Sequence, residues 1–291
     1  MLTIDPKTIS PAKVQGYLQG AIAPRPIAFA STMDKNGIPN LSPFSFFNVF
    51  SSNPPILVFS PARRGRDNTV KHTLINCEAT KEVVINVVSY DMVQQMSLSS
   101  TEYPEGINEF EKAGFEMLKS DVIKPFRVKE SPVQLECKVN EIIALGTKGG
   151  AGNLIICEVL KIHIDESILD ENGAIDPIKI DLVSRLGGNW YSRANKGLFE
   201  VEKPLATLGI GVDSIPNKIK ANPVFNGNDL GKLGNIECLP SKEEISIFVK
   251  GNFEIKAVLS ADDREKLCQL AKTYIDKNEI NTAWKVLLAE K

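Results

Sequence analysis

The amino-acid sequence predicts a mainly β protein with some α-helix, arranged as an antiparallel barrel rather than as a doubly wound parallel sheet. Short, β-branched apolar runs at 56–60 and 83–89 have the length and composition of buried strands. Two or three helical segments separate the strands, and an alternating series of strands and helices is missing. No Gly-x-Gly-x-x-Gly sequence opens a helix, so we do not expect a Rossmann domain.

Length and composition describe an ordinary globular chain with almost no net charge. Its 291 residues, 43% of them hydrophobic, suffice for one large domain or two small ones. The formal charge of -2 provides no global field for binding nucleic acid or an anionic membrane. No segment approaches the roughly 20 apolar residues that span a bilayer. Residues 1–6 lack the basic and apolar regions of a secretory signal, so we expect a cytoplasmic protein.

The cysteines and histidines predict neither disulfides nor a metal centre. The five cysteines are odd in number, widely spaced and never arranged as Cys-x-x-Cys, which argues against disulfides, zinc and iron–sulfur clusters. We expect them to be small buried side chains. The two histidines, His72 and His163, lie far apart in the sequence, so no histidine-rich metal site is predicted.

The N-terminal third of the chain begins with a hairpin signal. Residues 26–32 form an apolar run that predicts a strand, and 39–47 predict a returning extended segment. Between them, Asp-Lys-Asn-Gly at 34–37 predicts the turn, because Asn and Gly tolerate a positive φ. A short helix is expected over 69–80, and the charged run 102–112 is interpreted as a solvated helix or loop.

Two further strands are predicted from residues that alternate with a period of two. Apolar side chains alternate with polar ones over 133–140 and 160–165, so we expect two half-buried strands. His163 falls on the polar face of the second strand and is expected at the surface. The glycine-rich segment 146–152 is interpreted as a hairpin turn, because it lacks the Gly-Lys-Ser/Thr of a phosphate-binding loop and a strand follows it.

The chain changes character near residue 204, which divides it into a predicted domain over 1–203 and an extension over 204–291. Glycines and prolines interrupt the first part of this extension and little periodicity remains there, so we expect an ordered segment that wraps the barrel or a partner subunit. Ser-Ala-Asp-Asp at 260–263 matches a helix-start capping pattern, and apolar residues recur at helical spacing over 267–274. A further set over 280–288 either extends or restarts the helix to the C-terminus. This terminal helix is expected to dock either on a second subunit or on the core of its own chain.

Hydroxyls, amides and aromatic rings gather in two neighbouring segments, 31–48 and 53–60. A flat ring with a polar edge, such as a flavin, needs apolar contact on its faces and hydrogen bonds at its carbonyls and ring nitrogens. Three arginines at 63–66 then precede a helix start at 67–73, and this combination suits a phosphate. Taken alone, the arginine stretch also fits a solvated basic loop before a capped surface helix. Beside the aromatic segments, it indicates a site for flavin mononucleotide (FMN).

Several motifs in a fixed order resemble the flavin reductase-like family. They are Ala-Pro-Arg-Pro-Ile-Ala at 23–28, Ser-Thr at 31–32, Asn-Leu-Ser-Pro-Phe-Ser-Phe-Phe-Asn at 40–48, Pro-Pro at 54–55, Lys-His-Thr at 71–73 and Asn-Val at 86–87. The family is built on an FMN-binding split β-barrel and includes flavin reductase components and flavoredoxins. The resemblance covers roughly residues 10–200. It implies a split barrel with flanking helices, followed here by a C-terminal helical extension.

The resemblance also implies which residues contact the flavin. Residues 31–32 and 45–48 line the ring and the ribityl chain, Ser60 lies near the phosphate end, and Lys71 and Thr73 hold the phosphate. A later segment around 188–191 resembles the family's glycine-and-tyrosine segment, which approaches the ring. Arg64 is added to the phosphate end from the basic loop. The residues expected at the cofactor are Ser31, Thr32, Ser45, Phe46, Phe47, Asn48, Ser60, Arg64, Lys71, Thr73, Gly188 and Tyr191.

One departure from the family pattern is visible at His72, where the family often has an aspartate. It leaves the phosphate interpretation standing and removes an acidic residue from that position.

The resemblance implies an FMN-dependent oxidoreductase that transfers hydride from NADH or NADPH to the flavin N5. No side chain is expected to act as a catalytic acid or nucleophile, because the ring accepts the electrons. A homodimer is implied, and a partner monooxygenase or another electron acceptor protein is a further expectation. Two alternatives stay open: a flavoredoxin-type FMN electron carrier that does not oxidise NAD(P)H, and a non-enzymatic barrel that has lost its flavin.

Overall fold

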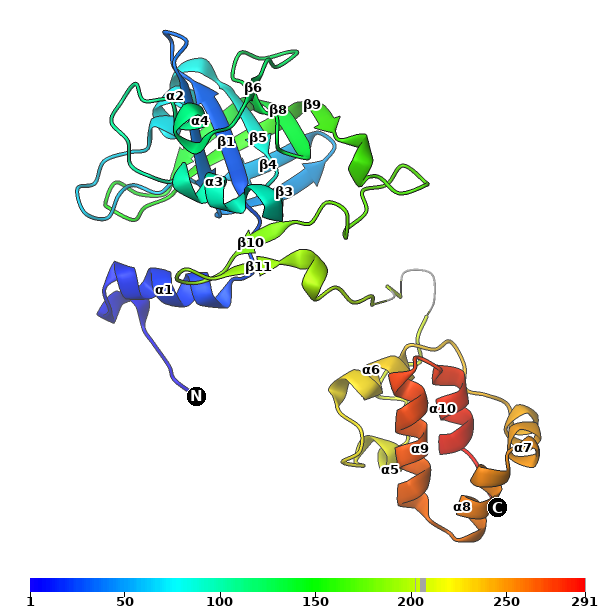
Figure 1. Ribbon diagram of the computed structural model, residues 1–291. Coiled ribbons are helices and arrows are strands. Elements are labelled where there is room, and N and C mark those ends of the chain that lie inside the picture. The colour runs from blue at the N-terminus through cyan, green and yellow to red at the C-terminus, as the bar shows by residue number, and fades with distance from the viewer. Residues whose placement is uncertain (202, 205–207, 291) are drawn as a thin grey trace. The chain divides into compact units, whose positions relative to one another are not determined.

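The computed structural model describes residues 1–201, 203–204 and 208–290 of the chain. It divides into two compact units, Met1–Phe199 and Glu200–Lys291, which we call the barrel unit and the helical unit (Figure 1). The two-domain assignment with a boundary at 203–204 stays a prediction, and it falls close to this division. No helix among the described residues is both long enough and apolar enough to cross a lipid bilayer.

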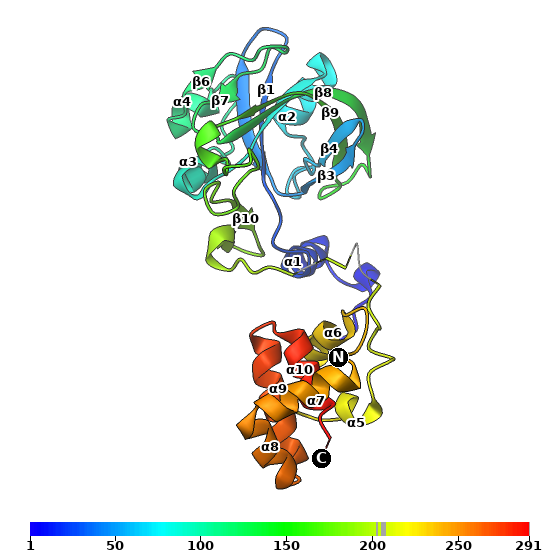
Figure 2. The ribbon, with the colours of Figure 1, turned by 90° about the vertical axis from the view of Figure 1, so that its right-hand side faces the viewer.

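The barrel unit is built on a seven-stranded sheet in which every neighbouring pair of strands is antiparallel. In Figure 2 the sheet curls round, with β1 on one side and β4 on the other. This confirms the predicted antiparallel barrel. In spatial order the strands are β2 (Pro39–Phe44), β1 (Ala28–Met33), β5 (Glu82–Asn86), β8 (Val133–Ala144), β9 (Asn153–Ile164), β4 (Pro55–Phe59) and β3 (Phe47–Ser52).

Short helices and two-stranded ribbons flank the sheet. Helix α2 (His72–Thr80) packs against β1 and β2, and helix α4 (Glu109–Ala113) packs against β2. The helices of this unit are α1 (Pro11–Ala21), α2 (His72–Thr80), α3 (Val93–Leu98), α4 (Glu109–Ala113), η1 (Pro6–Thr8), η2 (Tyr90–Met92), η3 (Glu166–Ile168) and η4 (Ala194–Lys196). The ribbons pair β6 (Met117–Leu118) with β7 (Arg127–Val128) and β10 (Val183–Arg185) with β11 (Tyr191–Arg193).

The predicted hairpin at the start of the barrel is confirmed, although its second arm is shorter than expected. Gly37 has a φ of +89° and its N–H donates to the Asp34 carbonyl, so the turn uses the backbone freedom of glycine. Strand β2 ends at Phe44 and β3 begins at Phe47, which makes 39–47 two elements and not one. Helix α2 also begins later than predicted, because Asn68 has a positive φ and the Asp67 carboxylate accepts the Thr69 N–H in a turn.

The glycine-rich segment 146–152 connects β8 to β9 as a hairpin turn, as predicted. Two of its glycines are there because another segment comes close. A Cβ on Gly149 would lie 2.9 Å from the Arg64 carbonyl oxygen, and one on Gly152 would lie 2.6 Å from the Ser60 Oγ. This turn therefore packs directly on the loop that carries the predicted phosphate arginines.

Strand β9 differs from its prediction in which face is buried. Leu160, Ile162 and Ile164 are 48%, 55% and 40% exposed, so the apolar row points outward. His163, expected at the surface, is instead half-buried and contacts Glu136. The buried apolar side chains of β9 are instead those of Ile155 and Cys157, nearer the start of the strand. A pattern of alternation alone does not reveal which side chains are buried.

The helical unit has its own apolar core, centred on the fully buried Trp284, whose indole N–H donates to the Leu233 carbonyl. The predicted C-terminal helical extension is confirmed, and the terminal helix restarts as α10 (Ile280–Leu287). The segment before residue 260, where the sequence shows little periodicity, is helical too, so the described residues of this unit form six helices. Helix α9 begins after Asp263, whose carboxylate accepts the Lys266 N–H, and this agrees with the predicted capping pattern. The helices are α5 (Asn217–Lys220), α6 (Gly227–Gly234), α7 (Lys242–Gly251), α8 (Phe253–Ser260), α9 (Arg264–Asp276) and α10 (Ile280–Leu287).

Candidate functional site

Two cavities of the barrel unit meet at Ser100. The first is small and almost entirely polar, and the second is an open cavity of about 570 Å³. The small cavity is lined by Asn40, Ser42, Arg64, Lys71, His72, Thr73, Ser99, Ser100, Thr101, Glu102, Tyr103 and Glu109. The large cavity is lined by Ile27, Pro43, Ser45, Gln94, Met96, Ser97, Ser100, Arg185, Asn189 and Tyr191.

The small cavity has a cationic end. Arg64 and Lys71 approach the Glu102 carboxylate, with N···O distances of 3.0 and 3.6 Å, and Arg66 forms a third ion pair with it. Hydrogen bonding by Arg64 and the charges of Lys71 and Arg66 hold the pKa of the Glu102 carboxyl below its ordinary value. The three cations share this single carboxylate, apart from a 3.2 Å pair between Arg66 and Asp67. Arg64 and Lys71 therefore meet Glu102 at one end of the cavity.

The loop before α2 fixes the Arg64 side chain in place. One guanidinium nitrogen of Arg64 donates to the Thr69 hydroxyl at 2.9 Å and to the Val70 carbonyl at 2.8 Å. Helix α2 then begins beside the cavity, with Lys71 as its N-cap residue and no side-chain cap. The first N–H groups of a helix have no intrahelical acceptor and carry a partial positive charge. Cationic side chains and a helix N-terminus thus converge on one small cavity, which is the donor set that a phosphate requires.

A buried polar network centred on Asn40 underlies this cavity. The Asn40 side-chain oxygen accepts from the hydroxyls of Thr73 and Thr32 at 2.9 and 3.3 Å. Asn76 donates to the Thr32 hydroxyl at 3.1 Å. The Asn40 amide in turn donates to the Glu109 carboxylate at 3.0 Å. Thr32 and Thr73 are essentially buried, so their hydroxyls hold Asn40 and the start of α2 in position instead of pointing into solvent.

Glu109 is a residue of this site that the sequence reasoning missed. It was assigned to a solvated run, yet it is only 5% exposed and its second carboxylate oxygen accepts the Leu41 N–H at 3.0 Å. This bond ties α4 to β2. The signal available in the sequence was the Asn108 that caps α4, which marks a helix start one residue before Glu109.

The large cavity carries aromatic and cationic groups. Ser45 and Tyr191 both line it, which brings two predicted ring-contacting residues together. The guanidinium of Arg185 lies 4.5 Å from the centre of the Tyr191 ring and donates to the Gly188 carbonyl at 2.9 Å. Gly188 has a φ of +58°, a conformation that favours glycine. Its carbonyl holds the Arg185 guanidinium at the wall of the cavity.

A second arginine, Arg25, is buried close to Arg185. Arg25 is 7% exposed, and its guanidinium donates to the carbonyls of Gln19, Ile22 and Leu186. Burial and the neighbouring Arg185 lower the pKa of Arg25 from its ordinary value. Arg185 therefore brings positive charge to the wall of the large cavity, and Arg25 adds a second cation near it.

The remaining predicted residues line neither cavity. Ser31 is fully buried in β1, and its Oγ has no hydrogen-bond partner among the described residues. Phe46 is 40% exposed, Phe47 packs on the barrel core and Asn48 is exposed. Ser60 is largely buried, and its N–H donates to the Phe46 carbonyl at 2.9 Å, which joins β4 to the start of β3. The two cavities thus bring together Ser45, Arg64, Lys71, Thr73 and Tyr191 from the predicted set.

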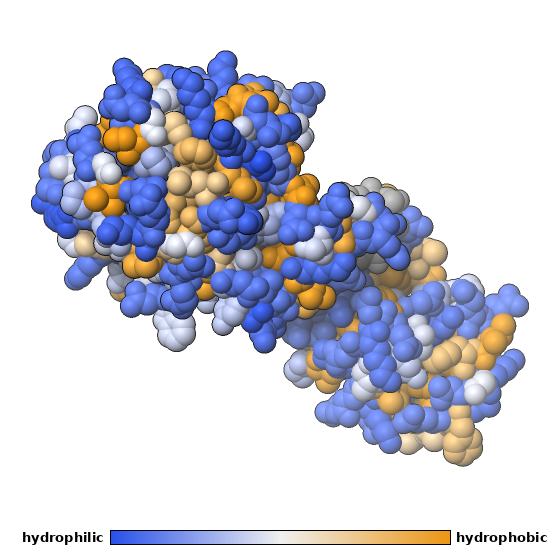
Figure 3. Space-filling view, turned by 45° about the horizontal axis from the view of Figure 1, so that its top comes forward, coloured by the Kyte–Doolittle hydropathy of each residue, from blue (hydrophilic) through white to orange (hydrophobic). Residues whose placement is uncertain are grey.

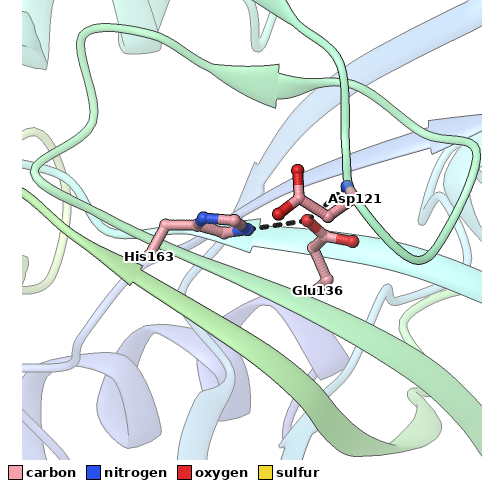
Figure 4. Close-up of side chains that lie close together, drawn as sticks. All are labelled: Asp121, Glu136 and His163. Atoms are coloured by element: carbon pink, nitrogen blue, oxygen red, sulfur yellow. Dashed lines mark hydrogen bonds and ion pairs between the residues drawn. The ribbon is translucent and has the colours of Figure 1, made fainter.

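A separate cluster joins Asp121, Glu136 and His163 on the barrel (Figure 4). The fully buried Glu136 accepts the N–H groups of Asp121 and Val122 at 2.8 Å each and contacts the His163 Nε2 at 2.7 Å. Burial raises the pKa of Glu136, but these hydrogen bonds outweigh it, so the pKa lies below its ordinary value. Lys161 forms an ion pair with the Asp121 carboxylate, so this carboxylate already has a cationic partner. The hydrogen bonds of Glu136 to Asp121 and Val122 anchor the loop after β6.

Three of the five cysteines are buried in the barrel core, as predicted, and the other two are not. Burial raises the pKa values of the Cys77 and Cys137 thiols to about 12, and Cys157 is shifted in the same direction. Cys238 is exposed and Cys268 is half-buried.

The fold and the cavities define an antiparallel split barrel in which a small polar cavity with two basic side chains lies beside a larger cavity. The sequence comparison gives the family: the model described as flavin reductase like domain matches residues 21–179, more than half of the chain. The chain belongs to the flavin reductase-like family. An uncharacterized protein of Aquifex aeolicus is 41% identical over 175 residues, which cover 60% of this chain and 87% of that protein.

Solved structures agree with this family. Nitrilotriacetate monooxygenase component B from Bacillus cereus is 30% identical with a TM-score of 0.65, and the match covers 69% of this chain and 98% of that one. A protein with a split barrel domain from Shewanella frigidimarina is 22% identical with a TM-score of 0.58, over 70% of this chain and all of that one, and shows the fold alone. These matches confirm the predicted split-barrel fold and the predicted family.

Proposed function

We propose that the barrel unit binds FMN and that the protein is an NAD(P)H-dependent flavin reductase. The observation that carries this proposal is the adjacency of the cavities: a cavity lined by Arg64 and Lys71 and a cavity of about 570 Å³ share Ser100 in their walls. FMN has the same polarity, with an anionic phosphate at one end and a flat ring at the other. Membership of the flavin reductase-like family supports the assignment.

Arg64, Lys71 and the N-terminus of α2 would hold the phosphate. Their donors are charged or carry the helix dipole, so they favour a dianion over a neutral group. Thr73 and Asn40 act behind them by fixing the first turn of α2 on β2. The donor set therefore fits a phosphate monoester without rearrangement of the buried network.

Ser45, Tyr191 and Arg185 would hold the ring. The flavin, when bound, supplies the redox chemistry, because its N5 accepts hydride from the nicotinamide. Tyr191 gives the ring an aromatic neighbour, and the Arg185 guanidinium, already aligned by Gly188, stabilises negative charge that develops on a nearby ring edge. The protein groups thus orient and stabilise, and the proposal needs no catalytic acid or nucleophile.

We further propose that the protein is a homodimer that passes reduced flavin to a partner monooxygenase or another acceptor protein. Exposed apolar side chains support the dimer: the outward row of β9, with Leu160, Ile162 and Ile164, and Tyr17 and Leu18 on α1, are at least 40% exposed. Apolar patches also stand out on the face in Figure 3. Apolar surface of this kind is typical of subunit interfaces. The similarity to a monooxygenase component B supports a partner monooxygenase.

The test is a visible absorption spectrum of the purified protein, followed by anaerobic addition of NADH and, separately, NADPH. We expect a flavin spectrum that bleaches with at least one nicotinamide, and steady nicotinamide consumption with excess FMN. Protein that binds FMN but neither bleaches nor consumes nicotinamide would be a flavoredoxin-type carrier. Colourless protein that does not bind added FMN would contradict both functions and leave the non-enzymatic barrel.

A further inference from the structure

We propose that Glu102 sets the affinity of the site for flavin phosphates, because its carboxylate competes with the phosphate monoester for Arg64, Arg66 and Lys71. The consequence is weaker FMN binding than these cations would give without the carboxylate. This inference rests on the proposed function, since it concerns the same site. It assigns a role to Glu102, which the sequence analysis placed in a solvated helix or loop.

The Glu102 carboxylate already occupies the position of an anion at the cationic cavity. Glu102 lines the small cavity and pairs with three cations, including Arg64 at 3.0 Å and Lys71 at 3.6 Å. These are the charged donors that a phosphate in this cavity requires. A phosphate and this carboxylate therefore need the same partners, and both carry negative charge.

The other acidic groups near the cavity do not take this position. Glu109 is committed to Asn40 and Leu41 in the buried network. Asp67 accepts from the Thr69 N–H and pairs only with the exposed Arg66. Glu102 is thus the carboxylate that faces the cations across the cavity among the described residues.

The attachment of Glu102 to the rest of the barrel is weak. Its side chain is 35% exposed, and its backbone N–H and carbonyl make no hydrogen bond to any described residue. The segment from Ser99 to Ile107 is held by a few turn hydrogen bonds, such as the Thr101 N–H to the Leu98 carbonyl. The Glu102 carboxylate is partly in contact with solvent, so water can solvate it when a stronger anion takes its cations. A dianionic phosphate is such an anion.

The test compares FMN with riboflavin, which has the same ring but no phosphate. Dissociation constants are measured by titration for the wild type, Glu102→Gln and the matched control Glu105→Gln, an exposed carboxylate of the same segment. Glu102→Gln should bind FMN about tenfold more tightly, a change that corresponds to about 1.4 kcal/mol. Riboflavin affinity should stay unchanged, and Glu105→Gln should behave as the wild type.

Two results would overturn the inference. One is an unchanged or weaker FMN affinity in Glu102→Gln, and the other is an equal gain for riboflavin, which would place the effect away from the phosphate. Glu102→Ala is the second variant, in case the glutamine form folds poorly. Circular dichroism of each variant confirms that the fold is intact.

Inorganic phosphate separates this inference from the proposed function. If the wild type binds neither flavin, the proposed function fails, and calorimetric titration with phosphate alone still decides the role of Glu102. Tighter phosphate binding by Glu102→Gln than by the wild type would support competition at the cationic cavity. Equal phosphate affinities would contradict it.

Discussion

The interiors of the two units differ in chemistry. The barrel unit buries a connected set of polar side chains, among them Thr32, Asn40, Thr73 and Glu109, directly behind the cationic cavity. Among the described residues of the helical unit, Asp229 is the one buried charged or polar side chain, and the interior is otherwise apolar. Buried polar groups are costly unless every partner is placed, so they fix a geometry more narrowly than apolar packing does.

This difference indicates what each interior contributes. The barrel's polar network holds β2, α2 and α4 in one arrangement beside the cavities, which is the kind of support that a binding site needs. The helical unit's core supplies stability through packing around Trp284. Changes to one interior should therefore leave the property of the other intact.

The largest effect is expected from Trp284→Ala in the helical unit. Removing a fully buried indole should lower the free energy of unfolding of this unit by about 3–5 kcal/mol. FMN affinity should not change. Denaturant unfolding followed by circular dichroism, with FMN titration on the same sample, measures both. Phe253→Ala, which truncates an 86% exposed ring on α8, is the control and should alter neither.

A loss of FMN binding in Trp284→Ala that Phe253→Ala does not share would contradict the independence of the two interiors, because the flavin site would then depend on the helical core.

The next effect is expected from Glu109→Gln in the barrel. The amide cannot accept from both the Asn40 amide and the Leu41 N–H, so one buried donor loses its partner at a cost of about 1–3 kcal/mol. FMN affinity should fall as well, since Asn40 positions the start of α2. The control is Glu111→Gln, an exposed residue of the same helix. Thermal unfolding and FMN titration that leave Glu109→Gln indistinguishable from Glu111→Gln would contradict the role of the network.

Lys71→Met tests whether the cationic cavity recognises the phosphate. Loss of one cation from the cationic cavity should weaken FMN binding about tenfold and leave riboflavin binding unchanged, because the phosphate alone distinguishes the two ligands. Lys35→Met, on the exposed turn between β1 and β2, is the matched control. Equal weakening for both flavins would show that Lys71 acts on the ring or on the fold.

The smallest effect concerns the acid stability of the barrel unit. The pKa of Glu136 in the folded protein lies below the ordinary value of 4.5, so the folded state binds fewer protons than the unfolded state near that pH. The contribution of Glu136 is therefore fully present above pH 4.5 and is lost as the pH falls through the lowered pKa. Glu136→Gln should show a shallower loss of stability below pH 4.5 than the wild type. Identical slopes in denaturant unfolding across this range would refute the assignment.

Local signals made much of the barrel predictable from sequence. The hairpin over β1 and β2 follows from Gly37 and its neighbours, and the turn between β8 and β9 follows from its glycines. Arg64 was found because a basic loop before a helix suits a phosphate, whereas Lys71 and Tyr191 were implied by the resemblance to the flavin reductase-like family; the cavities contain all three.

Features that depend on distant partners were not predictable. Glu109 sits in a run of charged residues, and its partner Leu41 is 68 positions away, so nothing local marks it as buried. Glu102 likewise lies 38 positions from Arg64. The outward apolar row of β9 looks like a buried row in the local alternation, and the short helices of the helical unit gave too few turns for a clear period.

The most direct test of the account is a crystal structure of the protein with FMN. The account predicts phosphate oxygens in contact with Arg64 and Lys71 at the start of α2, and the ring in the large cavity beside Ser45 and Tyr191. A phosphate bound away from both cations, or a ring outside that cavity, would contradict it.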